Sequence, residues 1–168
     1  QYASFYGLSS LSFKDGTPRI AATIGTAPQG PVHAVLDLGS TDVWFVNTNC
    51  SLSSSPPGPQ YTCPSKSSLG SVTSCMQPGA RGGFDPSLSS SWSFYPSPYC
   101  AVYGSGWTAG IEGEDIVQLG SSGTQQVWMA SVDAGQDSMA EVAAGGVVGL
   151  AFNGLASVTS PGVIQMVE

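Results

Sequence analysis

Short apolar runs, each closed by a turn of small residues, limit the folds that this chain of 168 residues can adopt. The chain holds 22 Gly and 12 Pro, and Ser-rich stretches lie between its apolar runs. Gly and Pro interrupt long helices and favour turns, whereas the β-branched and aromatic residues of the runs favour strands. We therefore expect an all-β fold built as one unit, because the chain shows neither an internal repeat nor a linker.

The turns divide the chain into short expected strands and connections. Residues 84–92 are expected to be turn-like, and residues 161–168 to begin a helix with Pro161 near its start. Residues 97–120 are expected to form a hairpin with its tip at Gly104–Gly106 and then a further strand. The other expected strands are, in chain order, 2–13, 19–24, 31–37, 42–46, 125–134 and 145–154, the last running into a glycine turn.

The charges are few and mostly acidic. Only 9% of the residues are charged, and 11 acidic residues against 4 basic ones give a net charge of -7. Nucleic acids and anionic membranes are bound by basic patches, so we expect neither partner. No apolar run approaches the roughly 20 residues that span a membrane, and no signal segment is visible, which suggests a processed chain. The acidic balance fits a protein that works at acid pH, and solubility explains it equally well.

Four cysteines are present, at widely spaced positions, and none of them forms a CxxC pair: Cys50, Cys63, Cys75 and Cys100. His33 is the only histidine, so the sequence does not favour a zinc site, and we expect neither a metal nor another cofactor. Two disulfides in a secreted protein are the better interpretation, and three pairings remain possible.

Three of these cysteines fall in a segment rich in Ser, Pro and Gly, about residues 50–83, which we interpret as a disulfide-tied surface insertion. It follows an expected strand directly, so it is placed to narrow one end of any cleft beside that strand, although a tolerated surface loop fits equally well. Asn49 begins a glycosylation sequon, but a disulfide at Cys50 would hinder its use.

An acidic residue interrupts the apolar stretch AVLDLGSTDVWFV, residues 34–46. A carboxylate among apolar residues is costly unless something holds it charged or lets it share a proton. Asp37 enters a turn in which Gly39 allows close approach of a ligand and Ser40 can donate a hydrogen bond. His33 precedes it on the same expected strand, but the chain lacks the G-x-S-x-G motif of a serine nucleophile. The loop alone fits a turn aspartate as well as a catalytic one.

Five segments, in the right order, resemble the N-terminal lobe of pepsin-like aspartic proteases, and the secreted fungal members look closest. They are ATIGTAPQ (22–29), VLDLGSTDVWFV (35–46), FDPSLSSSW (84–92), YGSGWTAGIEGEDIVQLG (103–120) and GVVGLAF (146–152). The second is similar to the family's active-site loop, and the fourth to its flap and the strand after the flap. The resemblance implies that residues 1–168 form a single all-β lobe, the N-terminal half of a bilobal acid protease. A turn aspartate no longer competes with the catalytic interpretation.

The resemblance also implies roles for individual residues. Asp37 would be one of two catalytic aspartates, with Gly39 allowing close substrate approach and Ser40 hydrogen-bonded to the outer carboxylate oxygen. Tyr103 would be the flap tyrosine, and Trp44 would donate to it through the indole N–H.

Four further residues would contact a bound peptide. Gly104 and Ser105 would offer backbone or hydroxyl contacts, and Val35 and Val147 would line the pocket for the residue before the scissile bond. Packing in the core is the competing role for both valines, as it is for Trp44.

The mechanism implied by the resemblance needs two carboxylates that share one proton, because two like charges so close cannot both ionise. One activates water for attack on the peptide carbonyl, and the other stabilises the oxyanion. This chain has no second Asp-Thr-Gly or Asp-Ser-Gly, since Asp15-Gly16 is interpreted as a turn. We expect the second aspartate on a partner chain that carries the C-terminal lobe and comes from the same precursor. A homodimer is the alternative, but this lobe has the longer, flap-bearing pattern.

The expected function is therefore an acid endopeptidase, secreted or in an acidic vacuolar compartment, that is processed from a zymogen and cleaves proteins or peptides between hydrophobic residues. The alternative is a non-catalytic pepsin-like protein that binds or inhibits another protein. Leu38 keeps that alternative open, because the family usually has Thr or Ser there, whose hydroxyl bonds to the opposite lobe. Losing a buried hydrogen bond costs about 1 kcal/mol. The retained Tyr103 and Trp44 favour an enzyme.

Overall fold

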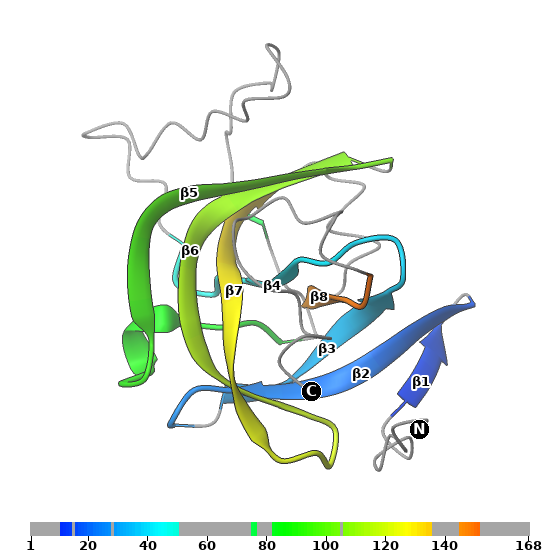
Figure 1. Cartoon of the computed structure of the whole chain (residues 1–168), viewed down its shortest axis with the longest axis horizontal. Coiled ribbons are helices and arrows are strands. Elements are labelled where there is room, and N and C mark those ends of the chain that lie inside the picture. The colour runs from blue at the N-terminus through cyan, green and yellow to red at the C-terminus, as the bar shows by residue number, and fades with distance from the viewer. Residues whose placement is uncertain are drawn as a thin grey trace.

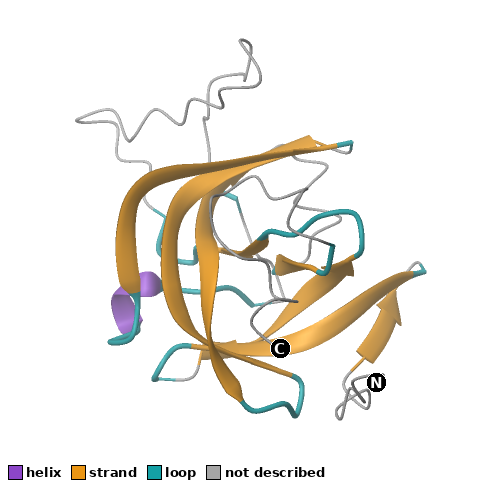
Figure 2. Cartoon of the chain, in the orientation of Figure 1, coloured by secondary structure: helices purple, strands orange, loops and turns teal. Residues whose placement is uncertain are grey.

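The computed structural model describes residues 11–14, 16–27, 29–50, 75–76, 82–104, 106–135 and 145–151. Strands make up most of this part of the chain, and its only helical element is a single 3-10 turn, η3 (Figure 2). The prediction of an all-β fold is confirmed. The predictions for residues 161–168, Ser105 and most of the 50–83 segment lie outside the described residues.

Eight strands follow one another along the described chain. They are β1 (Leu11–Lys14), β2 (Thr17–Ile24), β3 (Gln29–Asp37), β4 (Val43–Val46), β5 (Ser93–Tyr103), β6 (Gly106–Leu119), β7 (Thr124–Gly135) and β8 (Gly146–Gly149), with η3 (Pro86–Leu88) before β5. The strands lie where the sequence predicts them, except that β5 begins at Ser93 and not at residue 97, and residues 2–10 of the first expected strand lie outside the described residues. The second arm of the 97–120 hairpin and the expected further strand are one strand, β6, which a bulge between Ala109 and Gly110 bends without ending it.

The strands form one mixed sheet in the order β1-β2-β3-β8-β4-β7-β6-β5. The sheet closes on itself, because the end of β2 also pairs with the end of β6, at Ala22 with Leu119 and Ile24 with Val117. Figure 1 shows the result: the long strands β5, β6 and β7 curve around the short strands β4 and β8, and β2 crosses beneath them. The β5–β6 hairpin continues past this barrel to a tip at the upper right of the view.

β8 lies between β3 and β4 and runs parallel to β3 and antiparallel to β4. β4 also pairs in parallel with β7. A segment more than a hundred residues further along the chain thus separates the two strands that flank the Asp37 loop. The apolar pattern predicted each strand but not these parallel pairings.

The central strands are buried on both faces, so their sequences are continuous apolar runs rather than alternating ones. In β4, Val43 and Phe45 pack into the first core, while Trp44 and Val46 pack into the second. The first core consists of Ala22, Ile24, Val32, Ala34, Val43, Phe45, Phe84, Val117, Val127, Met129 and Val148. The second consists of Val35, Trp44, Val46, Met76, Tyr99, Ala101, Ala130, Val132 and Val147, with Tyr103 packed against it.

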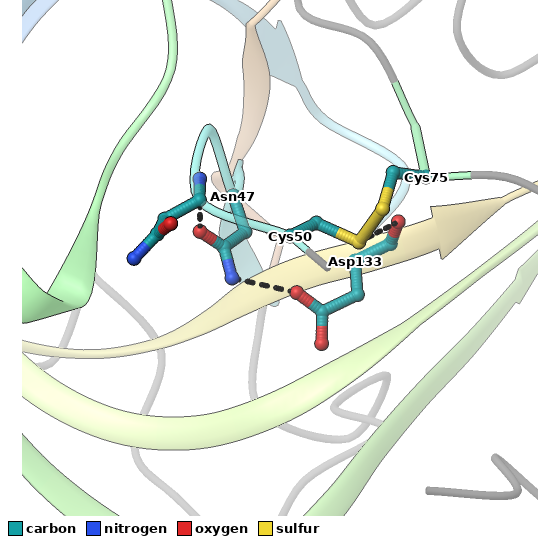
Figure 3. The surroundings of a disulfide bond; sticks show 5 residues. Asn47, Cys50, Cys75 and Asp133 are labelled. Carbon is teal, nitrogen blue, oxygen red and sulfur yellow. Dashed lines mark hydrogen bonds between the residues drawn. A yellow bond between two sulfur atoms is a disulfide. The ribbon is translucent and has the colours of Figure 1, made fainter. Parts of the chain in front are cut away.

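A disulfide joins Cys50 to Cys75 next to β7 (Figure 3). Asp133 of β7 contacts both sides of it: its carbonyl accepts a hydrogen bond from the Met76 backbone N–H at 2.8 Å and lies 3.6 Å from Cys50 Sγ, and its carboxylate accepts a hydrogen bond from Asn47 Nδ2 at 2.7 Å. None of the described cysteines is free. The chain on either side of the intervening segment is thereby fixed to the edge of the second core. That the segment is a surface insertion stays a prediction.

Candidate active site

Asp37 is the last residue of β3, and its carboxylate is fixed by the turn that follows. The backbone N–H of Gly39 donates to Oδ1 at 2.9 Å, and the hydroxyl of Ser40 donates to Oδ2 at 2.6 Å. Asp37 is half-buried and Ser40 is buried, whereas Leu38 between them is 80% exposed. Each carboxylate oxygen thus has a donor within the loop, and the carboxylate is oriented before any partner arrives.

The backbone of β8 fixes the loop from the other side. Asp37 pairs with Gly149, and the carbonyl of Asp37 accepts a hydrogen bond from Leu150 N at 2.7 Å. Gly149 N donates to the Asp42 carbonyl at 3.0 Å, and Ala151 N to the Ser40 carbonyl at 2.9 Å. The end of β3 and the start of β4 are therefore both bonded to the same three residues.

Gly149 has no space for a side chain. A Cβ atom there would lie 2.5 Å from the Thr41 carbonyl carbon, 2.6 Å from Ser40 O and 2.7 Å from Asp42 N. All three are backbone atoms of the Asp37 loop, which cannot move aside as a flexible side chain can. The lack of a side chain at this position lets β8 approach the loop closely.

Asp85 shows that two local hydrogen bonds do not by themselves make a catalytic carboxylate. Its Oδ1 accepts hydrogen bonds from Ser87 N at 2.9 Å and Ser87 Oγ at 2.7 Å, as the N-cap of η3. The local chemistry resembles that of Asp37. The two sites differ in what surrounds them, because only Asp37 lies next to β8 and within electrostatic reach of a tyrosine at the tip of the β5–β6 hairpin.

That tyrosine is Tyr103, the last residue of β5, and its hydroxyl accepts a hydrogen bond from Trp44 Nε1 at 2.8 Å. Trp44 is fully buried in the second core, so its indole holds the hydroxyl at a fixed place. Burial raises the pKa of Tyr103 to about 12; the contacts with Tyr99 and Trp44 oppose this increase, and the charges of Asp42 and Asp37 add to it. Tyr103 is therefore a neutral phenol at acid and neutral pH.

The family model described as eukaryotic aspartyl protease matches residues 19–167 of the chain. The chain belongs to this family. It is 33% identical over 139 residues to Aspartic protease 6 of Caenorhabditis elegans, an alignment that covers 80% of this chain and 29% of the relative. It is also 34% identical over 100 residues to Aspartic protease 17 of the same organism, with 58% and 21% covered. The chain thus spans less than a third of the length of these relatives.

The other residues singled out in this member of the aspartyl protease family fall into three groups. Val35 and Val147 are register partners on β3 and β8, and both are buried in the second core. Gly104 is exposed at the hairpin tip, and a Cβ atom there would meet nothing within 4 Å. Ser105 lies outside the described residues. His33 is a half-buried residue in the middle of β3.

Sequence reasoning missed three residues of the site: Asp42, Tyr99 and Gly149. Asp42 and Tyr99 are 4% and 1% exposed, and the Tyr99 hydroxyl lies 3.4 Å from Asp42 Oδ2. An acidic residue at the start of the apolar run DVWFV was the available signal, because such a residue is rarely buried without a partner. For Gly149 the signal was a glycine between apolar residues in a short strand.

Within the described residues no cluster of three or more His, Cys, Asp or Glu side chains is suited to hold a metal ion. The same part of the chain contains no helix of the length and apolarity that a membrane span requires.

Proposed function

We propose that this chain is the N-terminal lobe of an acid endopeptidase and that Asp37 is one of its two catalytic aspartates. The observation that carries the proposal is the Asp37 carboxylate, oriented by Gly39 N and Ser40 Oγ at the end of β3 and within electrostatic reach of the Trp44-bound Tyr103. Membership of the aspartyl protease family supports it.

In the proposed mechanism, Asp37 shares one proton with a second aspartate. The ionised carboxylate removes a proton from water as the water oxygen attacks the peptide carbonyl, and the protonated one stabilises the developing oxyanion. Ser40 and Gly39 fix the direction of the Asp37 lone pairs, which is the contribution of this lobe to the geometry. Tyr103 and the exposed Gly104 contact the substrate from the hairpin, with Ser105 beside them in the sequence.

The second aspartate comes from a C-terminal lobe encoded by the same precursor, as a separate chain after processing. Substrates are peptide bonds between hydrophobic residues, bound against Val35 and Val147. The protein is secreted, or retained in an acidic vacuolar compartment, and the Cys50–Cys75 disulfide accords with an oxidising compartment.

Two matched substitutions test the catalytic role in the two-lobe protein. Asp37→Asn keeps the size of the side chain and removes its charge, so hydrolysis of a peptide substrate at acid pH is expected to fall by more than a thousandfold. Asp85→Asn makes the same change in a similarly hydrogen-bonded carboxylate and is expected to retain activity. Equal activities of Asp37→Asn and wild type would refute the proposal.

Leu38 favours a second candidate function, a non-catalytic protein that binds or inhibits another protein. It is 80% exposed beside Asp37 and offers no hydroxyl to an opposite lobe. Native mass spectrometry with sequencing of the co-purified chains separates the two functions. A partner with its own Asp-Thr-Gly or Asp-Ser-Gly supports the protease, whereas a lone monomer or a partner without that aspartate supports the binding protein.

A further inference from the structure

A buried tyrosine lies directly behind the hairpin tyrosine. Tyr99 precedes Tyr103 by four residues on β5, and the strand alternation places both side chains on the face of the second core. The Tyr99 hydroxyl lies 3.4 Å from Asp42 Oδ2 and 3.5 Å from the Tyr103 hydroxyl. Together with the bond of 2.8 Å from Trp44 Nε1 to Tyr103, these contacts form a continuous chain of four polar groups.

The hydrogen atoms available fix the direction of this chain. An indole N–H only donates, an ionised carboxylate only accepts, and each tyrosine has one proton to donate. If Tyr99 donated to Tyr103, the contact between Tyr99 and Asp42 would join two oxygens without a proton. With Asp42 ionised, all three contacts are satisfied only when Trp44 donates to Tyr103, Tyr103 to Tyr99, and Tyr99 to Asp42.

A buried carboxylate provides the acceptor at the end of the chain. Asp42 begins the run into β4 and is 4% exposed, and its charge raises the pKa of both tyrosines. The Asp42 charge also acts on Glu112 of β6: burial raises the pKa of Glu112, the Trp128 indole opposes this increase, and the Asp42 charge adds to it. Glu112 therefore holds its proton more readily than an exposed glutamate does.

We propose that Asp42 and Tyr99 are positioning residues for the protease reaction: they take up the only proton of Tyr103 and fix its hydroxyl between Trp44 and Tyr99. Tyr103 then has no proton to donate to a bound peptide and meets it as a hydrogen-bond acceptor. The hairpin tip is thereby held by contacts with a buried carboxylate and not by apolar packing alone. This inference rests on the proposed function, because it assigns Tyr103 to the substrate site.

Tyr99→Phe tests the proposal, because it removes the hydroxyl and keeps the buried ring. The two contacts of Tyr99 are long, so their loss is expected to raise KM about two- to fivefold with little change in kcat. Hydrogen exchange of the Trp44 indole, assigned by its absence from Trp44→Phe, is expected to accelerate by a similar factor. Tyr95→Phe is the matched control, since Tyr95 lies on the same strand with its ring against Trp128 and is 46% exposed.

Asp42→Asn separates positioning from packing. An amide can donate to Tyr99, which reverses the chain and frees the Tyr103 proton without emptying the site. We expect this variant to keep slow indole exchange and to change KM, whereas Asp42→Ala should accelerate the exchange as Tyr99→Phe does. The proposal is overturned if Tyr99→Phe exchanges at the wild-type rate, or if it lowers the melting temperature alone. A wild-type protein without hydrolysis would refute the proposed function, and the exchange rates would then decide the hydrogen-bond chain independently.

Discussion

Gly149→Ala should damage the Asp37 loop although it adds one methyl group to a residue with no catalytic group of its own. The added Cβ would lie 2.5 Å from the carbonyl carbon of Thr41, about 0.9 Å closer than the 3.4 Å at which ordinary contacts begin. Ser40 O and Asp42 N are nearly as close, at 2.6 and 2.7 Å. The methyl group is therefore accommodated only if β8 and the loop separate by roughly 1 Å.

That displacement acts on both stability and activity. Overpacking of this size typically costs about 1–3 kcal/mol of unfolding free energy. It also stretches the bonds from Gly149 N to Asp42 O and from Ala151 N to Ser40 O, and so moves the Ser40 hydroxyl that orients Asp37. A misplacement of about 1 Å in a catalytic group can cost on the order of a hundredfold in rate.

The assay is urea unfolding together with peptide hydrolysis at acid pH, both on the two-lobe protein. Gly123→Ala is the matched control, because a Cβ atom at Gly123 would meet nothing within 4 Å. It should leave activity unchanged and stability within about 0.5 kcal/mol of wild type. If Gly149→Ala has wild-type stability and rate, close approach of β8 does not fix the loop, and the account of the site given above is wrong.

Three further predictions concern the same site. Ser40→Ala removes a charge-assisted hydrogen bond of 2.6 Å to Asp37 and should lower kcat/KM about ten- to hundredfold. Ser87→Ala removes the corresponding hydroxyl donor to Asp85 and should leave kcat/KM unchanged. Leu38→Thr introduces a hydroxyl that can bond to the proposed second lobe and should raise kcat/KM about fivefold. A decrease in kcat/KM would mean that the exposed leucine itself contacts that lobe. Glu112 has a folded-state pKa above its ordinary value of 4.5 because it is buried. Its contribution to stability is therefore full below pH 4.5 and is lost as the pH rises through the folded-state pKa. Urea midpoints from pH 3.5 to 7 should fall less steeply for Glu112→Gln than for wild type, and parallel curves would contradict this.

The strands and the Asp37 loop could be predicted because they depend on local sequence. The run DVWFV is buried on both faces as β4, and the apolar residues before Asp37 form β3. The pairing of β8 between them could not be predicted, because nothing in a four-residue apolar strand specifies which of several apolar strands it joins. The family resemblance supplied the importance of GVVGLAF, and only the structure supplies its physical reason, the clash that a side chain at Gly149 would create.

The polar part of the site was harder to predict because a charged residue in a sequence normally indicates an exposed position, whereas Asp42 is buried. From the sequence alone, Asp42 would be an exposed acidic residue at the start of a strand, and Tyr99 an aromatic residue in a hairpin arm. Folding brings these residues, 57 positions apart, to within 3.4 Å, and their contact gains its significance from a third residue, Tyr103. An apolar pattern determines which faces are buried, but hydrogen-bond partners depend on distances of a few tenths of an ångström between strands that are not sequence neighbours. The residues that position other residues are therefore the ones that a pattern reveals last: here they are Gly149, which has no space for a methyl group beside the Asp37 loop, and, in the proposed hydrogen-bond chain, the buried Asp42 behind Tyr99 and Tyr103.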